Sequence, residues 1–163
     1  MTDRGNSVAS GNASSGSRPD ASTPALAVRA LRATAAHLER TLARALEPHG
    51  LTTAQFAALQ VLNDAKEQSL GCTEVGKRLA GPAPDVTRLL DRLEAGGLVA
   101  RDRNQEDRRL VHTRITPDGE RLLHQAAPSY QEAESRALGE LDPEEQEHLV
   151  QLLSGIQRNC PGQ

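Results

Sequence analysis

The stretch LVARDRNQEDRRLVHTRIT, residues 98–116, decides the fold that we predict for this chain. It opens with a short apolar run, residues 98–99, and closes with residues 111–115, in which apolar and polar side chains alternate. Such alternation is typical of a half-buried β-strand. The segment between the two runs, residues 101–109, contains no apolar residue and includes four arginines. We therefore predict a β-hairpin whose tip is polar and rich in arginine.

Apolar periodicity predicts helices over most of the remaining chain. Large apolar residues recur at spacings of three and four within residues 26–45, 56–62, 86–93 and 149–156. This spacing places them on one face of an α-helix. A short helix containing Val75 and a long helix after the hairpin complete the prediction. The fold class is mainly α with a small β-hairpin.

Local signals mark where these helices begin and end. Residues 52–55 and 142–145 have the spacing of a capping box, and residues 116–117 combine a threonine cap with a proline in the first turn. The double glycine at 96–97 ends a helix. Proline within a helix removes a backbone donor, so we expect Pro128 to kink or end the helix that contains it.

The N-terminal residues 1–24 are rich in Ser, Gly and Asn and almost free of large apolar groups. Such a segment buries too little surface to offset the entropy of ordering it. We therefore expect a disordered tail over residues 1–24.

Composition excludes several classes of protein. The formal net charge of -3 gives no general attraction to DNA or to anionic membranes. Residues 70–116 carry nine basic and seven acidic groups, whereas residues 117–163 carry three basic and nine acidic groups. The single Phe, single Tyr and absence of Trp argue against a stacking platform for single-stranded nucleic acid. No apolar run approaches the roughly 20 residues that a membrane helix needs.

The sequence predicts neither an enzyme nor a metal or cofactor site. It contains no phosphate-binding glycine loop, no zinc-protease motif and no ordered nucleophile and base, and its five histidines lack metal-ligand spacing. Two cysteines make no disulfide framework, which favours a reducing cytoplasm. Cys72 precedes a short helix, where a thiol is either a redox sensor or a small buried apolar group.

Residues 52–116 have the order helix, short helix, tight turn, helix, hairpin. In a helix–turn–helix protein the second of two such helices enters the major groove of DNA. Here that recognition helix is predicted at residues 83–96. Thr87 and Arg88 lie early enough in it to reach base edges, and arginine matches the two acceptors of guanine. The hairpin then lies beside it as a wing, whose arginines suit a narrow minor groove.

These residues resemble the winged helix of the MarR family of bacterial transcription regulators. The resemblance is carried by the segment TEVGKRLAGPAPDVTRLLDRLEAGGLVARDRNQEDRRLVHTRITPDGERLL, from Thr73 to Leu123, and extends more loosely over most of residues 26–157. Its signature elements are Val86-Thr87-Arg88-Leu89, Asp91-Arg92-Leu93-Glu94, Gly97-Leu98-Val99, Asp107-Arg108-Arg109 and Ile115-Thr116 with Gly119.

The resemblance implies a cytoplasmic homodimer that binds a palindromic operator in double-stranded DNA, acts as a repressor and is released by a small-molecule effector. It implies dimerisation segments at residues 25–50 and 117–158, flanking a DNA-binding region at 51–116. Apolar stripes in the first and last helices, at heptad-like spacing, suit packing between two chains. The family's effector pocket lies between the dimerisation helices and the winged helix. With so few aromatic residues, we expect an aliphatic and polar pocket here.

The predicted DNA-binding residues come from the recognition helix and the wing. They are Ala83, Pro84, Asp85, Thr87, Arg88, Arg92, Asp107, Arg108 and Arg109. The resemblance implies that Arg109 enters the minor groove and that Asp107 holds it in place. Relatives often have polar residues where this chain has Pro82, Ala83 and Pro84.

Each assignment has an alternative. Asp85 either accepts from a cytosine amine or caps the helix. Arg88 pairs with Asp85 or Asp91 if it does not contact DNA, and Arg92 pairs with Asp91 or Glu94. Asp107, Arg108 and Arg109 are otherwise turn residues and solvated charges. At the level of the whole protein, the alternative is a winged-helix module that binds a protein partner without specific DNA binding.

Overall fold

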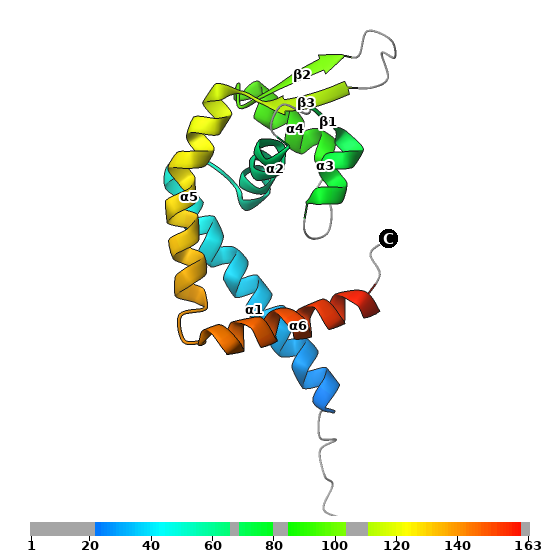
Figure 1. Cartoon of the computed structure of the whole chain (residues 1–163), viewed down its shortest axis with the longest axis vertical. Helices are drawn as coiled ribbons and strands as arrows, with labels where there is room; N and C mark the ends of the chain where they lie inside the picture. Colours follow the sequence, from blue (N-terminus) through cyan, green and yellow to red (C-terminus); the bar gives the residue numbers. More distant parts are fainter. Residues whose placement is uncertain (1–21, 66–68, 80–84, 104–110, 161–163) are drawn as a thin grey trace, which may run out of the picture. The chain divides into compact units, whose positions relative to one another are not determined.

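The structure is a computed structural model that describes residues 22–65, 69–79, 85–103 and 111–160. Helices dominate it, as predicted (Figure 1). The elements are α1 (Thr23–Leu46), a short 3-10 helix η1 (Glu47–His49), α2 (Thr53–Asp64), β1 (Leu70–Gly71), α3 (Cys72–Arg78), α4 (Val86–Ala95), β2 (Val99–Arg103), β3 (Val111–Ile115), α5 (Pro117–Ala137) and α6 (Pro143–Asn159). Most of the predicted tail, residues 1–21, lies outside the described residues, and its last two residues begin α1.

The chain divides into two units, residues 1–34 and residues 35–163. Helix α1 runs across the boundary. The sheet and every helix after α1 lie within residues 35–163.

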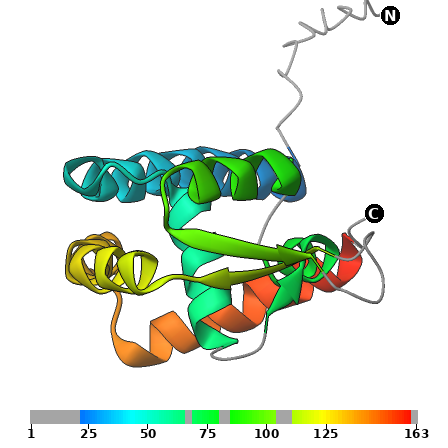
Figure 2. The ribbon, with the colours of Figure 1, turned by 90° about the horizontal axis from the view of Figure 1, so that it is seen from above.

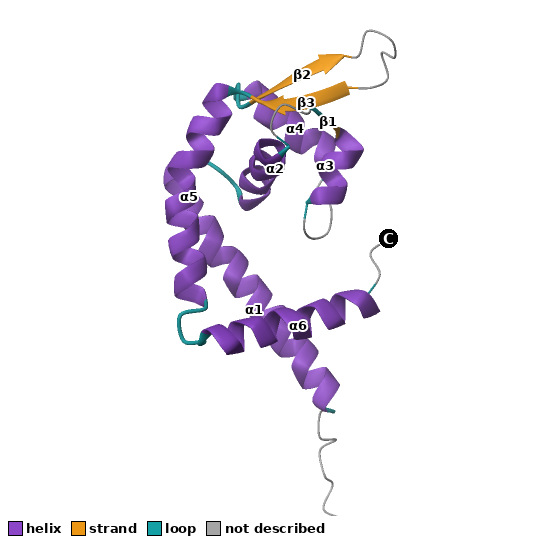
Figure 3. Ribbon diagram, in the orientation of Figure 1, coloured by secondary structure: helices purple, strands orange, loops and turns teal. Residues whose placement is uncertain are grey.

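The sheet has three strands in the order β1-β3-β2, all antiparallel. Strands β2 and β3 form the predicted hairpin and lie side by side (Figures 2 and 3), with Val99 opposite Ile115 and Arg101 opposite Thr113. The third strand, β1, was not expected, because two residues are too few to show an alternating pattern. The prediction that residues 101–103 belong to the polar segment between the two strands is wrong. They continue β2, because its backbone hydrogen bonds to β3 do not depend on apolar side chains.

The core confirms the predicted helix faces. Phe56, Leu59 and Leu62 of α2 are at most 1% exposed, and Leu90 and Leu93 of α4 are buried with them. The predicted capping box at the start of α2 is present, with its side-chain and backbone bonds both formed. Helix α2 packs against β3 of the sheet on one side and against α5 on another.

The junction between the wing and α5 is unusually close. Thr116 caps α5 by accepting from the Gly119 amide at 3.1 Å, and its own hydroxyl donates to the Gly97 carbonyl at 2.7 Å. A Cβ at Gly119 would lie 2.1 Å from the Leu98 carbonyl oxygen. Glycine is therefore required where α5 crosses the start of the wing.

The last two helices, α5 and α6, differ in how far they are buried. Of the two expectations for Pro128, an end of the helix is wrong, because α5 continues to Ala137 and packs on either side of the proline, at Leu123 and Ala133. Helix α6 begins with the predicted capping box but has no buried residue. Its apolar side chains are therefore only partly covered within one chain.

Candidate nucleic-acid interface

The predicted recognition helix is α4, but it begins at Val86 rather than at residue 83. Asp85 is its N-cap, and the Asp85 carboxylate accepts from the Arg88 amide at 3.2 Å. Capping by aspartate satisfies a backbone donor that no helical partner reaches, which explains the later start. Of the two alternatives for Asp85, the helix cap is the one observed. Ala83 and Pro84 lie outside the described residues.

Helix α4 is sharply divided into an apolar and a polar face. Leu89, Leu90 and Leu93 are buried, as predicted. Thr87, Arg88 and Arg92 are exposed on the other faces. The Arg88 side chain is 79% exposed and pairs with Asp85 at 3.2 Å, an exposed link that contributes little to stability. Arg88 is therefore available to an acceptor outside the chain.

The short helix α3 braces α4, which confirms the helix–turn–helix arrangement. A Cβ at Gly76 would lie 3.3 Å from a Val86 methyl group, so the two helices are in close contact. The Cys72 thiol lies 3.6 Å from the Thr87 hydroxyl. Cys72 is only half-buried, and its contact fixes the start of α3 against the first turn of α4.

The hairpin lies beside α4, and its two strands carry a cross-strand ion pair. Arg114 donates to Asp102 at 3.1 Å, with both side chains more than half exposed. The predicted minor-groove residues Asp107, Arg108 and Arg109 lie outside the described residues.

Arg101 of β2 also contacts the candidate interface, and the sequence analysis did not single it out. Its guanidinium donates to Asp91 at 2.6 Å and to the Thr87 carbonyl at 3.2 Å, and lies 3.7 Å from Glu94. The carboxylates that were candidates for Arg92 are thus held by Arg101. The alternation of side chains along a strand could have indicated this contact. Arg101 lies two residues after the buried Val99 and therefore on the same face of the sheet.

The single Tyr and the single Phe of the chain stack together. The ring centroids of Tyr130 on α5 and Phe56 on α2 are 4.4 Å apart. Burial raises the pKa of the Tyr130 hydroxyl above 10.0, and the nearby charges of Glu134 and Glu39 raise that pKa further. This contact ties α5 to the winged-helix core.

Comparison with known proteins identifies this arrangement. The sequence model of the MarR family matches residues 49–110. Over 105 residues the chain is 32% identical to the HTH-type transcriptional regulator YkoM of Bacillus subtilis, in an alignment that covers 64% of this chain and 67% of YkoM. The chain belongs to the MarR family.

Solved structures of DNA-binding proteins have the same fold as this chain. Sco3205 of Streptomyces coelicolor, a MarR family transcriptional regulator solved in complex with DNA, is 25% identical, with a TM-score of 0.77 over 84% of this chain and 90% of Sco3205. BpsR of Bordetella bronchiseptica, whose DNA binding is regulated by 6-hydroxynicotinic acid, is 27% identical, with a TM-score of 0.72 over 80% of this chain and 98% of BpsR. Membership of the MarR family makes the chain a DNA-binding transcriptional regulator rather than an enzyme. It also favours this function over a module for protein partners.

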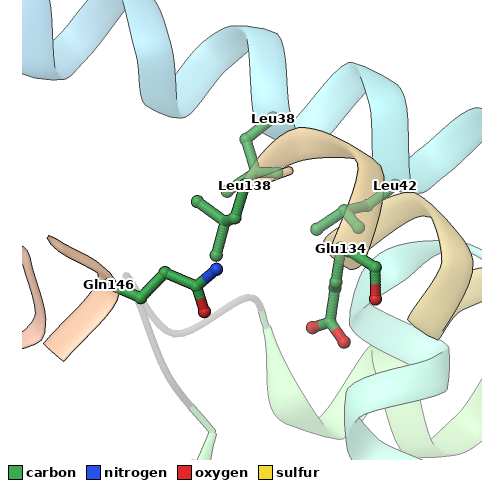
Figure 4. Close-up of a pocket in the computed structure, with 6 residues that line it drawn as sticks. Leu38, Leu42, Glu134, Leu138 and Gln146 are labelled. Carbon is green, nitrogen blue, oxygen red and sulfur yellow. The ribbon is translucent and has the colours of Figure 1, made fainter. Parts of the chain in front are cut away.

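Two open cavities lie along α5 in this MarR-family chain. The first, of about 420 Å³, is lined by Leu38 and Leu42 of α1, Glu134, Ser135 and Leu138 of α5 and Gln146 of α6 (Figure 4). The second is also about 420 Å³ and is lined by Thr41, Arg44, Ala45, Pro48, Ser129, Glu132, Ala133 and Arg136. Neither cavity contains an aromatic side chain among these residues. The first is mainly apolar, whereas the second carries two arginines.

Within the described part of the chain, neither a metal-binding cluster nor a membrane-spanning helix is present. No group of three or more His, Cys, Asp or Glu side chains there is placed to hold a metal ion. No helix of the described residues is long and apolar enough to cross a membrane.

Proposed function

We propose that this chain is a repressor that binds a palindromic operator as a homodimer in the bacterial cytoplasm. In each copy, α4 enters the major groove and the hairpin lies against the minor groove. The observation that supports this most is the exposed first turn of α4, where Thr87 and Arg88 stand opposite a fully buried leucine face. Arg92, one turn further on, is exposed on the same helix. The solved complex of Sco3205 with DNA supports DNA binding by a chain of this fold.

The remaining contacts follow from the family resemblance. Ala83 and Pro84 would approach thymine methyl groups just before α4, where apolar side chains make their base contacts. Asp85 would act mainly as the helix cap. Arg109 would enter the minor groove, with Asp107 orienting it and Arg108 facing phosphate.

Dimerisation is supported by apolar side chains that a single chain leaves exposed. In α1, Leu26 and Val28 are 52% and 55% exposed. In α6, Val150, Leu152 and Ile156 are 62%, 56% and 45% exposed. We infer that residues 25–50 and 117–158 form the dimerisation segments and that residues 51–116 bind DNA. Burying these leucines and valines against a second copy removes the apolar surface from water.

We infer that the effector is a small organic acid that binds in the second cavity. Arg44 supplies positive charge there, Arg136 is paired with Glu132 of the same lining, and the Thr41 and Ser129 hydroxyls supply hydrogen bonds. The regulation of BpsR by 6-hydroxynicotinic acid supports this class of ligand. The cavity adjoins Pro48, which links α1 to the winged helix, so an occupied cavity would favour a different spacing of the two recognition helices.

The operator proposal is tested by binding of the purified protein to duplex DNA from upstream of its own gene, across a salt series. Counterion release makes the logarithm of affinity fall linearly with the logarithm of salt concentration. Arg109→Ala should weaken specific binding at least about tenfold and lower the salt slope by roughly 1. Arg121→Ala, which removes an exposed charge from α5, is the matched control. No preference over random duplex at any salt concentration would exclude operator binding.

Effector binding is tested by calorimetry with 6-hydroxynicotinic acid as the probe. Arg44→Ala should abolish binding to the second cavity, and Leu38→Ala, which alters the first cavity, should leave it unchanged. Equal binding by both variants would exclude the second cavity as the site. The ligand should also lower the affinity of the wild-type protein for its operator.

A further inference from the structure

Among the described cations of the hairpin, Arg101 makes the most polar contacts. It lies on β2, and its side chain is only 18% exposed. Its guanidinium donates to the Asp91 carboxylate at 2.6 Å and to the Thr87 carbonyl at 3.2 Å, and it lies 3.7 Å from the Glu94 carboxylate. All three acceptors belong to α4. One wing residue therefore contacts about two turns of the recognition helix, from Thr87 to Glu94.

The other ion pairs of the described residues differ in kind. Those of Arg78, Arg88, Arg121 and Arg136 join neighbours on the same helix, and that of Arg114 joins the two strands of the hairpin. Their side chains are at least 44% exposed, and such pairs contribute little to stability. Within the described part of the chain, the pairs of Arg101 are the ones that connect the hairpin to α4.

The contacts of Arg101 also account for two carboxylates on α4 that would otherwise be unfavourable for DNA binding. Asp91 and Glu94 lie on the helix that faces DNA, and their side chains are 53% and 44% exposed. Carboxylates at that place would repel phosphates. Pairing both with one guanidinium reduces the repulsion, while the bond to the Thr87 carbonyl fixes the direction from which the guanidinium approaches.

We propose that Arg101 is a positioning residue for DNA recognition, which holds the wing and the recognition helix as one rigid head. This inference rests on the proposed operator binding. The distance between the groups that enter the major and minor grooves is then set inside each protomer. An effector would act by moving the wing and α4 of one protomer together, relative to those of the other. The wing would keep its position on α4.

Asp91→Asn gives a test in which two explanations predict opposite changes in affinity for the operator. If Asp91 were only a negative charge near DNA, removing the charge would strengthen binding. If Asp91 is the anchor for Arg101, the substitution loosens the wing and weakens binding. We expect affinity for the operator to fall at least about fivefold, about 1 kcal/mol by the relation of tenfold to 1.4 kcal/mol. Asp118→Asn, which removes an exposed, ion-paired carboxylate from α5, should change affinity less than about twofold, as expected for an exposed ion pair.

Arg101→Met completes the experiment by keeping the length of the side chain and removing its charge and donors. We expect it to weaken operator binding at least about tenfold, a loss in the range for charged hydrogen-bonded groups. The double variant with Asp91→Asn should be no weaker than Arg101→Met alone, because both substitutions break the same contact. Arg121→Met is the matched control. Circular dichroism checks that each variant is folded, and Asp91→Asn carries the test if Arg101→Met is not.

The outcomes separate this inference from the proposed function. A wild-type protein without sequence preference would overturn both. Specific binding by the wild type, together with Arg101→Met within about twofold of it, would overturn only the positioning role, since a lost charge-assisted contact costs more than that. Asp91→Asn that strengthens binding, with a salt slope lowered by roughly 1 in Arg101→Met, would instead make Arg101 a direct phosphate contact.

Discussion

Gly119→Ala probes the close junction between the wing and α5. The added Cβ would lie 2.1 Å from the Leu98 carbonyl oxygen and 2.9 Å from the Ile115 side chain. The Leu98 carbonyl cannot simply move away, because it accepts a hydrogen bond from the Thr116 amide at 3.0 Å. The substitution must therefore shift either the start of β2 or the first turn of α5.

The magnitude follows from three contributions to the free energy of unfolding. Overpacking a filled site costs about 1–3 kcal/mol. Weakening the bond between Thr116 and Leu98 adds about 1 kcal/mol. Alanine is the better helix former by about 1 kcal/mol, which offsets part of this loss. We expect Gly119→Ala to lower the free energy of unfolding by about 2 kcal/mol, close to the middle of these opposing contributions.

Urea unfolding followed by circular dichroism measures this change. Gly96→Ala is the matched control, because the same methyl group there has its nearest neighbours at 3.5 Å. That variant should lie within about 0.5 kcal/mol of the wild type. If Gly119→Ala is also within about 0.5 kcal/mol, the close approach of α5 to the wing does not constrain the fold, and the argument fails.

Three further predictions concern the core, the aromatic pair and the dimer. Leu90→Ala, at a site only 1% exposed, should lower the free energy of unfolding by about 2–5 kcal/mol in the same urea assay, and a smaller loss would mean that the core closes around the cavity. Because the pKa of Tyr130 is raised, folding is favoured by its neutral form below pH 10.0, and this contribution is lost as pH rises through the folded-state pKa. Absorbance of tyrosinate reports Tyr130 alone, so its midpoint should lie above 10.0 in the native protein and fall in urea; equal midpoints would contradict the burial. Leu152→Glu places a charge on the exposed stripe of α6 and should yield folded monomers in sedimentation equilibrium, whereas an unchanged dimer would exclude that stripe from the interface.

Local signals predicted much of the fold because each depends on only a few neighbouring residues. The capping boxes at residues 52–55 and 142–145 are both present, and the positive φ of Gly97 ends α4 as the double glycine indicated. The alternation over residues 111–115 predicted β3, whose Thr113 and Ile115 are buried. The MarR resemblance was evident for the same reason, since its motifs are short and lie close together along the chain.

Contacts between distant residues could not be predicted in this way. The strand β1 exists because residues 70–71 reach the free edge of β3, and its two residues show no pattern of their own. Helix α5 continues through Pro128 because packing on α2 outweighs one missing hydrogen bond. A sequence gives the propensity of a segment, but the energy that overrides propensity comes from its tertiary neighbours.

The candidate DNA interface also has features that depend on local sequence and features that depend on tertiary contacts. By itself the sequence determined the exposed first turn of α4, because the leucine periodicity fixes which face is buried and leaves Thr87 and Arg88 outside. Only the tertiary structure decided which arginine holds Asp91 and Glu94. The sequence suggested the neighbour Arg92, whereas the hairpin brings in Arg101 from the next element. The physical reason is that helix faces follow from local geometry, while ion pairs between elements depend on how those elements dock.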